Sequence, residues 1–287
     1  MGFVIVDLEF NNISETNKKK YGLENEIIEI GAVKVDNRLT ELKKLKRYIK
    51  PSICLQISSE VSKITNITID VLNKEGCSFI EAFNELRKMF DEGDILCSWA
   101  KDDIAELIRN CEFYGINDIS WLKGYLDIQE YTCKVLSHKK ALGLKKAVDD
   151  LKIKVDEKKL HDALYDAEEE LSVFKRVYNC RIVKNHVIKD VYEIASVNIK
   201  NLEKIDVNEQ MLTLKCPKCG NKLILDTDIK LKKWRFMSVS HCSKCTVKVF
   251  LEILPRMTLK KELKLIEITT IISESDYFDK IYKLNKS

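Results

Sequence analysis

Two pairs of closely spaced cysteines constrain the fold of this chain more than any other feature of its sequence. Cys216 and Cys219 form the sequence CPKC, and Cys242 and Cys245 form CSKC after a further 22 residues. Four thiolates make a closed tetrahedral zinc site of the structural type, because no ligand position is left open for water. Gly220, directly after the first pair, permits the tight turn that presents sulfur atoms to a metal. The pattern therefore predicts one structural zinc ion.

The stretch that holds these cysteines, residues 210–254, is rich in strand-forming residues and has little helical periodicity. With strands between the two pairs, it resembles a zinc ribbon. Two disulfides are the alternative use of four cysteines, but a reducing compartment disfavours them. Single cysteines among apolar neighbours are expected to be reduced residues of the core. Six fit that description: Cys54, Cys77, Cys97, Cys111, Cys133 and Cys180.

The composition indicates a compact globular protein. Of 287 residues, 45% are hydrophobic and 33% are charged, with only 3 prolines and 9 glycines, which excludes collagen-like and natively disordered chains. No stretch approaches the roughly 18 consecutive apolar residues of a membrane helix, and the N-terminus has no basic segment followed by an apolar one. We therefore expect a cytoplasmic protein with no membrane partner. A net charge of +4 neither requires nor excludes nucleic acid.

The first part of the chain predicts a mixed α/β sheet flanked by helices. Residues 3–10, 26–35 and 42–50 are successive runs of strand formers, which fits a meander. Helical periodicity follows from residue 78, around 104–111, over 143–151 and over 162–178, with a short strand at 95–99. Strands first and strand–helix alternation later are typical of such a sheet.

A change of pattern near residue 181 predicts two domains. Residues 1–180 are expected to form the α/β domain and residues 181–208 a connector of mixed apolar and charged residues. Residues 209–287 are then the zinc ribbon and a C-terminal tail, in which Leu263 to Ile272 has the composition of a strand.

The first predicted strand carries two acids. Asp7 and Glu9 are two residues apart, so their side chains point to the same side of a sheet. Like charges side by side on an otherwise apolar strand repel unless a cation neutralises them, which makes a divalent metal their natural partner. Two solvated acids at a strand end are the simpler interpretation, and the D-x-E pattern alone does not decide between the two.

Two later motifs favour the metal site. Asp103 lies near the start of the helix after strand 95–99, and in HDALYDA His161 stands five residues before Asp166. Asp, Glu, Asp and His-x4-Asp in this order resemble the DEDDh exonucleases, a branch of the ribonuclease-H-like superfamily. The resemblance covers roughly residues 3–178 and includes EIIEIGAV, YIKP, ITNIT, CSWAKDD and DIQE. The sequence looks most similar to the histone-mRNA exonuclease and KapD-like group.

The resemblance implies a role for each motif residue. Asp7, Glu9, Asp103 and Asp166 match the four metal-binding acids, and His161 matches the general base. It also implies two Mg or Mn ions: Asp7, Glu9 and Asp166 would hold the first, Asp7 would bridge to the second, and Asp103 would support the site.

Asp103 is preferred to Asp102 because it falls four residues after Trp99, as in that group. Three positions depart from the group's pattern: Ala100 replaces a usual glycine, Asp162 a frequent arginine and Glu169 a frequent asparagine. None of the three is one of the five central residues, so activity is still expected.

The implied activity is that of a metal-dependent 3′-to-5′ exonuclease acting on single-stranded DNA or RNA. Two cations about 4 Å apart can clamp the attacking and leaving oxygens of an in-line displacement. A histidine, with an ordinary pKa of about 6.5, can take a proton from metal-bound water near neutral pH. The alternatives are a satisfied surface histidine at His161 and, for the whole chain, an inactive nucleic-acid-binding or regulatory protein on the same fold.

Between the cysteine pairs, residues 230–236 read KLKKWRF. Cations that alternate with aromatic residues combine phosphate attraction with base stacking. The stretch is therefore a candidate site for single-stranded nucleic acid, formed by Lys230, Lys232, Lys233, Trp234 and Arg235. A solvated strand with one packed aromatic face fits equally well, and the zinc ribbon could instead bind a protein partner.

Overall fold

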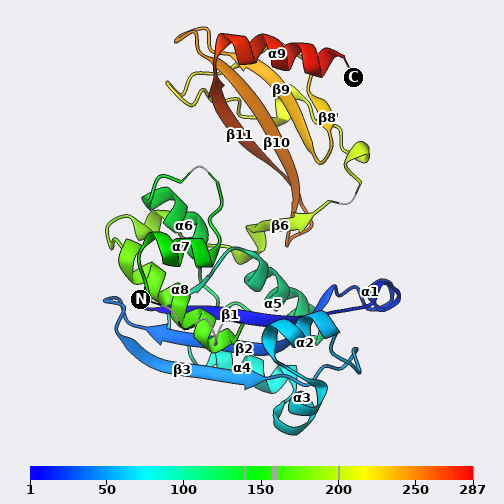
Figure 1. Ribbon diagram of the computed structural model, residues 1–287, viewed down its shortest axis with the longest axis vertical. Coiled ribbons are helices and arrows are strands. Elements are labelled where there is room, and N and C mark those ends of the chain that lie inside the picture. The colour runs from blue at the N-terminus through cyan, green and yellow to red at the C-terminus, as the bar shows by residue number, and fades with distance from the viewer. Residues whose placement is uncertain (139, 155, 157–160, 200, 287) are drawn as a thin grey trace. The chain divides into compact units, whose positions relative to one another are not determined.

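The computed structural model describes residues 1–138, 140–154, 156, 161–199 and 201–286. The chain folds as two compact units, Met1–Ile194 and Ala195–Ser287 (Figure 1). The boundary lies between Ile194 and Ala195, so residues 181–194 of the expected connector belong to the first unit and residues 195–208 to the second.

The first unit is built on a five-stranded sheet in the order β3-β2-β1-β4-β5. Its strands are β1 (Phe3–Asn12), β2 (Asn25–Val35), β3 (Glu41–Tyr48), β4 (Ile95–Ser98) and β5 (Tyr125–Asp127). β1 pairs antiparallel with β2, and β2 pairs antiparallel with β3, which confirms the predicted meander. β4 pairs parallel with β1, and β5 parallel with β4, so the sheet is mixed.

Helices connect and cover these strands (Figure 1). They are α1 (Glu15–Tyr21), α2 (Ser59–Thr65), α3 (Ile69–Glu75), α4 (Phe79–Arg87), α5 (Asp102–Phe113), α6 (Ile128–Val135), α7 (Leu144–Asp150) and α8 (Ala163–Val177). The expected helix from residue 78 is α4, which begins with a capping box between Ser78 and Glu81. α8, the longest of the described helices, begins after Asp162, whose side chain accepts from the Tyr165 N–H.

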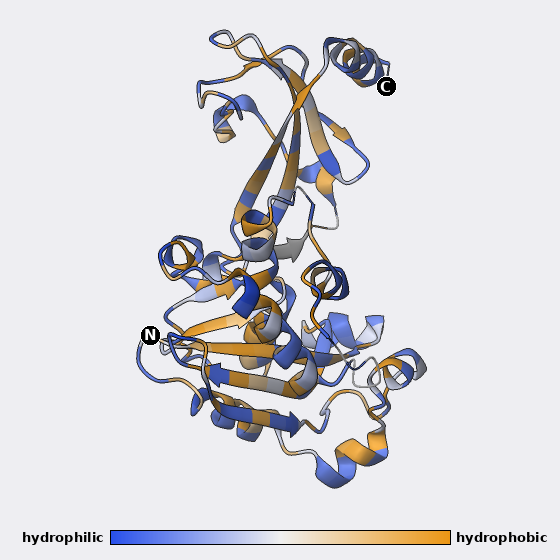
Figure 2. Ribbon diagram, turned by 60° about the vertical axis from the view of Figure 1, so that its left-hand side comes forward, coloured by the Kyte–Doolittle hydropathy of each residue, from blue (hydrophilic) through white to orange (hydrophobic). Residues whose placement is uncertain are grey.

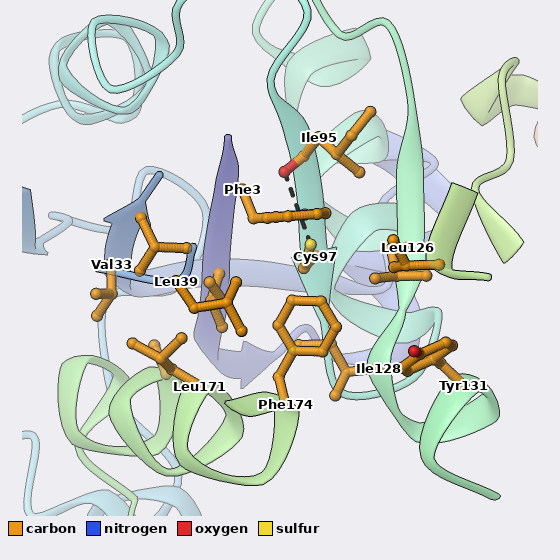
Figure 3. Close-up of a cluster of buried hydrophobic side chains, with 14 of the residues drawn as sticks. Phe3, Val33, Leu39, Ile95, Cys97, Leu126, Ile128, Tyr131, Leu171 and Phe174 are labelled. Atoms are coloured by element: carbon orange, nitrogen blue, oxygen red, sulfur yellow. Dashed lines mark hydrogen bonds between the residues drawn. The ribbon is translucent and has the colours of Figure 1, made fainter. Parts of the chain in front are cut away.

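The core beside α8 determines how this helix lies on the sheet. Phe3 on β1 packs with Leu171 and Phe174 of α8 and with Cys97 of β4 (Figure 3). Ile5, also on β1, belongs to the same cluster. The rings of Phe3 and Phe174 meet edge to face, with centroids 5.3 Å apart. Because side chains alternate along a strand, Asp7 and Glu9 continue the face that begins with Phe3 and Ile5. The acids of β1 therefore lie on the side of the sheet that α8 covers.

The central strands of the sheet in the first unit are more apolar than its edge strand. In Figure 2 the hydrophobic colour is concentrated on the central strands of the first unit, whereas the edge strand β3 is mostly hydrophilic. β3 carries ELKKLKRY, and lysines on an edge strand discourage pairing with a further strand.

The second unit is a six-stranded sheet with one helix. Its main path runs β11-β10-β9-β7, while β6 pairs with β10 and β8 pairs with β9. The elements are β6 (Ala195–Asn198), β7 (Ile224–Leu225), β8 (Lys230–Lys232), β9 (Arg235–His241), β10 (Lys248–Thr258), β11 (Leu263–Ile272) and α9 (Glu274–Asn285). The strand expected at 263–272 is confirmed as β11. The rest of the tail forms α9, which covers Val239 with Tyr277 and Leu284.

All ten cysteines are free thiols. Of the six single cysteines, Cys97, Cys111 and Cys133 are buried as expected. The prediction was wrong for Cys180, which is exposed because it lies in the turn after α8, and Cys54 and Cys77 are only half-buried. Among the helices in the described ranges, none has the length and apolar character needed to cross a membrane.

Candidate active site

β1 presents the first two acids at the point where its pairing becomes irregular. Asp7 lies opposite Gly31 of β2 and Glu9 lies opposite Glu29, and the register shifts between Glu9 and Phe10. Such a bulge redirects side chains and is often found beside functional sites. Both acids are half-buried on the face toward α8.

The glycine opposite Asp7 allows the start of α8 to approach the sheet. A Cβ atom on Gly31 would lie 2.0 Å from the main-chain carbon of Ala163, far inside van der Waals contact. The N–H of Ala163 also donates to Oε2 of Glu29 at 3.4 Å. A residue without a side chain at position 31 is therefore required for the first turn of α8 to contact β2 next to the acids of β1.

The start of α8 brings in the histidine and the last acid. The ligand atoms of Glu9, His161 and Asp166 lie within 4.8 Å of one another. His161 is exposed and Asp166 is half-buried, so this group lies at the surface of the unit. Asp7 and Asp103 lie outside the 4.8 Å group, although the charges of Glu9 and Asp166 raise the pKa of Asp7, and the charge of Asp103 raises the pKa of Glu9.

Burial distinguishes Asp103, the third predicted acid, from its neighbour Asp102. Asp103, in the first turn of α5, is only 8% exposed, whereas Asp102 is exposed. The turn before α5 contains Ala100 with φ of 75°, in the left-handed region. Glycine enters this region without steric cost, which explains why a glycine suits this position. The turn aims Asp103, and not Asp102, toward the acids of β1.

The electrostatics of the site are dominated by buried carboxylates that lie close together. Burial and then the charges of Asp103 and Glu170 raise the pKa of Asp7 well above its ordinary value. Burial and then Asp166 raise the pKa of Glu9 to about 8. Burial also raises the pKa of Asp103 and Asp166. The common cause is that burial and like charges both disfavour the ionised form.

These residues fit divalent cations. Oδ1 of Asp166 and both carboxylate oxygens of Glu170 are buried without a hydrogen-bond partner among the described residues. Carboxylate oxygens are the ligands that Mg²⁺ and Mn²⁺ prefer, and a bound cation offsets both burial and mutual repulsion.

A lysine network beside the site escaped the sequence analysis. Nζ of Lys46, on β3, lies 3.0 Å from Oε1 of Glu29 and also pairs with Asp162. Asp162 is the N-cap of α8, so Lys46 ties the edge strand to the segment that carries His161. In the sequence, Lys46 is only one of several lysines that alternate along a predicted strand. That pattern is too common to predict which acids the lysine pairs with.

Two further acids of α8 lie at the site: Glu169, which the sequence analysis named only as a departure from the family pattern, and Glu170, which it missed. Both are buried, and burial followed by the charge of Asp166 raises the pKa of Glu169 to about 7. In the sequence they belong to the run EEE after Asp166, which is typical of a solvated helix face. The helical spacing of four between Asp166 and Glu170 was the one available signal.

The second unit holds the four paired cysteines together. Their sulfur atoms all lie within 4.8 Å of one another. Sγ of Cys216 is 3.6 Å from Sγ of Cys245, and Sγ of Cys219 is 3.5 Å from Sγ of Cys242. A zinc–sulfur bond of about 2.3 Å implies sulfur–sulfur edges of about 3.8 Å in a tetrahedron, so the cluster fits zinc.

Both cysteine pairs lie on the same kind of turn. The N–H of Gly220 donates to the carbonyl of Cys216 at 2.9 Å, and the N–H of Thr246 donates to the carbonyl of Cys242 at 2.8 Å. Gly220 and Thr246 both have positive φ, 73° and 58°. The tight turn expected at Gly220 is present, and it recurs at Thr246 without a glycine.

The candidate nucleic-acid stretch forms the hairpin of β8 and β9. Trp234 is 49% exposed at its tip, Lys233 is exposed, and Phe236 is buried. The guanidinium of Arg235 lies 3.6 Å from the Trp234 ring centroid and pairs with Glu252. Nζ of Lys230 donates to the Leu284 carbonyl at 3.0 Å. Lys230 and Arg235 are thus engaged within the unit, and the exposed part of the patch is its tip.

Comparison with known proteins places the first unit in a family. A family model described as Exonuclease matches residues 4–174, more than half of the chain. The chain is 33% identical over 153 residues to the DNA polymerase III subunit epsilon of Buchnera aphidicola subsp. Schizaphis graminum (strain Sg). That match covers 50% of the chain and 61% of the relative, so the chain spans about three fifths of the length of this curated protein.

Solved structures share the fold at low identity. The nuclease domain of 3′hExo, a DEDDh family member bound to rAMP, matches with a TM-score of 0.52 and 17% identity over 64% of this chain and 92% of that chain. A 3′-exonuclease recognising the 3′ end of a histone mRNA stem-loop matches with a TM-score of 0.53 and 16% identity over 65% of this chain and 84% of that chain. A structure of exonuclease I matches with a TM-score of 0.55 and 12% identity over 99% of this chain and 70% of that chain.

The predicted fold class is confirmed on both counts. The first unit has the mixed, helix-flanked sheet of the ribonuclease-H-like exonucleases, and the β-rich second unit with its four-cysteine cluster fits a zinc ribbon. At such identities the solved structures show the fold alone, whereas the family model extends over most of the first unit. The chain therefore belongs to the Exonuclease family.

Proposed function

We propose that this chain is a metal-dependent exonuclease that removes nucleotides from the 3′ end of single-stranded DNA or RNA. The observation that carries the proposal is the convergence of Glu9, His161 and Asp166 within 4.8 Å, beside Asp7 and the buried Asp103. Family membership supports the same reaction class. Among the similar structures are that of a 3′-exonuclease described by its recognition of the 3′ end of a histone mRNA stem-loop and that of E. coli exonuclease I in complex with single-stranded DNA.

In this proposal Asp7, Glu9 and Asp166 would hold a first divalent cation, Mg or Mn, Asp7 would also contribute to a second, and Asp103 would support the site directly or through water. Bound cations would stabilise the attacking and leaving oxygens of the phosphodiester. His161 is exposed at the rim of the cluster, where its ring can accept the proton of an attacking water molecule. The main-chain N–H of His161 donates to the carboxylate of Asp166 at 3.1 Å, which fixes the position of His161 relative to Asp166.

Matched DNA and RNA oligonucleotides labelled at either end test the activity and the substrate together. With Mg or Mn, we expect a 5′-labelled strand to shorten gradually and a 3′-labelled strand to release its label at once. Asp7→Ala should reduce turnover to less than about one hundredth, since it removes one of the carboxylates that would hold the cations. Asp102→Ala, which changes the exposed neighbour of Asp103, should keep the activity.

The alternative is an inactive nucleic-acid-binding protein on the same fold. It would bind the oligonucleotides without releasing product under any metal condition. Turnover that survives Asp7→Ala would instead point to a contaminating nuclease and refute the proposed site.

For the second unit we propose one zinc ion bound by Cys216, Cys219, Cys242 and Cys245, and contact of the hairpin tip with the single strand. Lys232, Lys233 and Trp234 are the residues left to make that contact, because Lys230 and Arg235 bond within the unit. An exposed indole next to cationic side chains suits a stacked base and its phosphates.

Binding by the full chain in an Asp7→Ala background tests the hairpin. Trp234→Ala should weaken binding by about 1–3 kcal/mol if a base stacks on it. Each lost lysine contact should reduce the slope of log affinity against log salt by about 0.7. Lys264→Ala, which changes an exposed residue of β11, is the matched control.

Cys216→Ser should weaken binding as the hairpin variants do, because a structural thiolate site supplies folding energy. If the affinity for the strand and its salt dependence are unchanged in these variants, the hairpin does not bind nucleic acid, and a protein partner is the alternative for the zinc ribbon.

A further inference from the structure

Glu170 is an unusual residue for the middle of a helix packed against a sheet. Its side chain is 0% exposed, and neither carboxylate oxygen has a hydrogen-bond partner among the described residues. Its helical neighbours Ala167 and Leu171 belong to the apolar core between α8 and the sheet. A leucine would satisfy that environment, so packing alone does not account for a carboxylate.

The direction of Glu170 follows from how α8 lies on β1. Phe174 packs on Phe3, at the start of the strand, while Ala163 packs on Gly31, opposite Asp7. The helix therefore runs antiparallel to the strand. Glu170 lies between these two contacts and one turn from Asp166, so it faces the strand near Asp7.

The electrostatic neighbours of Glu170 agree with this placement. After burial, the strongest influence that raises the pKa of Glu170 is Asp103, followed by Asp166. Glu170 in turn raises the pKa of Asp7, after burial and Asp103. The main chain of Trp99 and the carboxyl of Asp7 are its polar neighbours, and neither makes a hydrogen bond of good geometry with it.

A buried carboxyl group without a donor is stabilised either by a bound proton or by a positive partner, and only a positive partner allows it to be ionised. Lys46, the cation of the neighbouring network, is engaged by Glu29 and Asp162. The groups that act most strongly on Glu170 are acids that the proposed function already assigns to divalent cations. The same cations are therefore the available counter-charge for Glu170.

We propose that Glu170 is a fifth carboxylate of the divalent-cation site, beyond the four acids that the family resemblance implies. It acts from the floor of the site, behind Asp7, and increases the affinity for the cations. The inference rests on the proposed function only in assuming that the carboxylates bind divalent cations.

Manganese binding by the full chain tests this role without an activity readout. Isothermal titration and the rise in melting temperature with Mn²⁺ are measured for the wild type, Glu170→Gln and Glu170→Ala. We expect both variants to bind Mn²⁺ about 10- to 100-fold more weakly. Both should fold, since each removes a charge from a repelling cluster. Glu168→Gln is the matched control from the same turn, because Glu168 faces outward to Lys44; its Mn²⁺ affinity should stay within about twofold of the wild type.

Mn²⁺ affinity that is unchanged or higher in Glu170→Gln and Glu170→Ala would overturn the proposal. A wild type that binds no Mn²⁺ would overturn it as well. The oligonucleotide assay separates this result from the fate of the proposed function: a wild type that binds Mn²⁺ through Glu170 but cleaves no strand refutes the exonuclease and leaves the cation site standing.

Discussion

The main-chain N–H of His161 donates to Oδ2 of Asp166 at 3.1 Å, and His161 itself adopts a left-handed backbone with φ of 64°. A non-glycine residue in this conformation costs about 1–2 kcal/mol. The hydrogen bond, together with the N-cap at Asp162, closes the H-x4-D motif into a compact turn. The spacing between the histidine and the acid thus has a structural reason in the start of α8.

His161→Ala should separate proton transfer from metal binding. We expect the rate to fall by about 10² to 10⁴, as on the loss of a general base, while Mn²⁺ affinity is retained. Single-turnover cleavage and Mn²⁺ titration of the same preparation check this. His138→Ala, in the turn after α6, is the control and should leave both quantities unchanged. A loss of Mn²⁺ affinity as large as the loss of rate would make His161 a ligand instead.

Gly31→Ala should inactivate the protein although position 31 is not itself a site residue. The new Cβ would lie 2.0 Å from the Ala163 main chain, so the start of α8 must move away from β2 and carry His161 and Asp166 with it. Cleavage rate and melting temperature should both fall. Gly143→Ala is the control, because a Cβ there meets no atom within 4 Å. Full activity in Gly31→Ala would contradict the proposed dependence of the site on this close approach.

Ala100→Gly should stabilise the fold. Ala100 has φ of 75°, and relief of a left-handed alanine, about 1–2 kcal/mol, exceeds the added backbone entropy of a glycine, about 0.5–1 kcal/mol. Urea unfolding should show a net gain of up to about 1 kcal/mol with cleavage activity retained. Ala105→Gly, within helix α5, should instead destabilise by about 1 kcal/mol or more. If Ala100→Gly is less stable than the wild type, the left-handed backbone at Ala100 is not strained.

Without added Mg or Mn, the folded state should become less stable as the pH rises. The pKa of Glu9 is raised from 4.5 to about 8, so the folded state binds its proton more tightly than the unfolded chain does. This contribution is complete below about pH 4.5 and is lost as the pH passes through about 8. Melting temperatures at about pH 5.5 and about pH 8.5 check the trend. Glu9→Gln should flatten it, and added Mn²⁺ should restore stability at the higher pH. A melting temperature that rises with pH would contradict the raised pKa.

The sequence alone determined those features that depend on neighbours along the chain. Strand β1 with Asp7 and Glu9 on one side follows from period-two alternation, and β11 follows from its run of strand formers. The paired cysteines predicted a closed cluster because two short turns suffice to present four sulfur atoms. A local pattern is enough where the interacting groups are only a few residues apart.

Only the tertiary structure decided which charged and small residues are buried. Glu170 reads as part of a solvated EEE run, yet the packing of Phe174 on Phe3 turns it toward Asp7. Cys180 looks like a core residue and lies exposed. Gly31 is required because Ala163, far away in the sequence, touches it. Burial depends on what a distant segment places against a residue, and no periodicity along the chain records that partner.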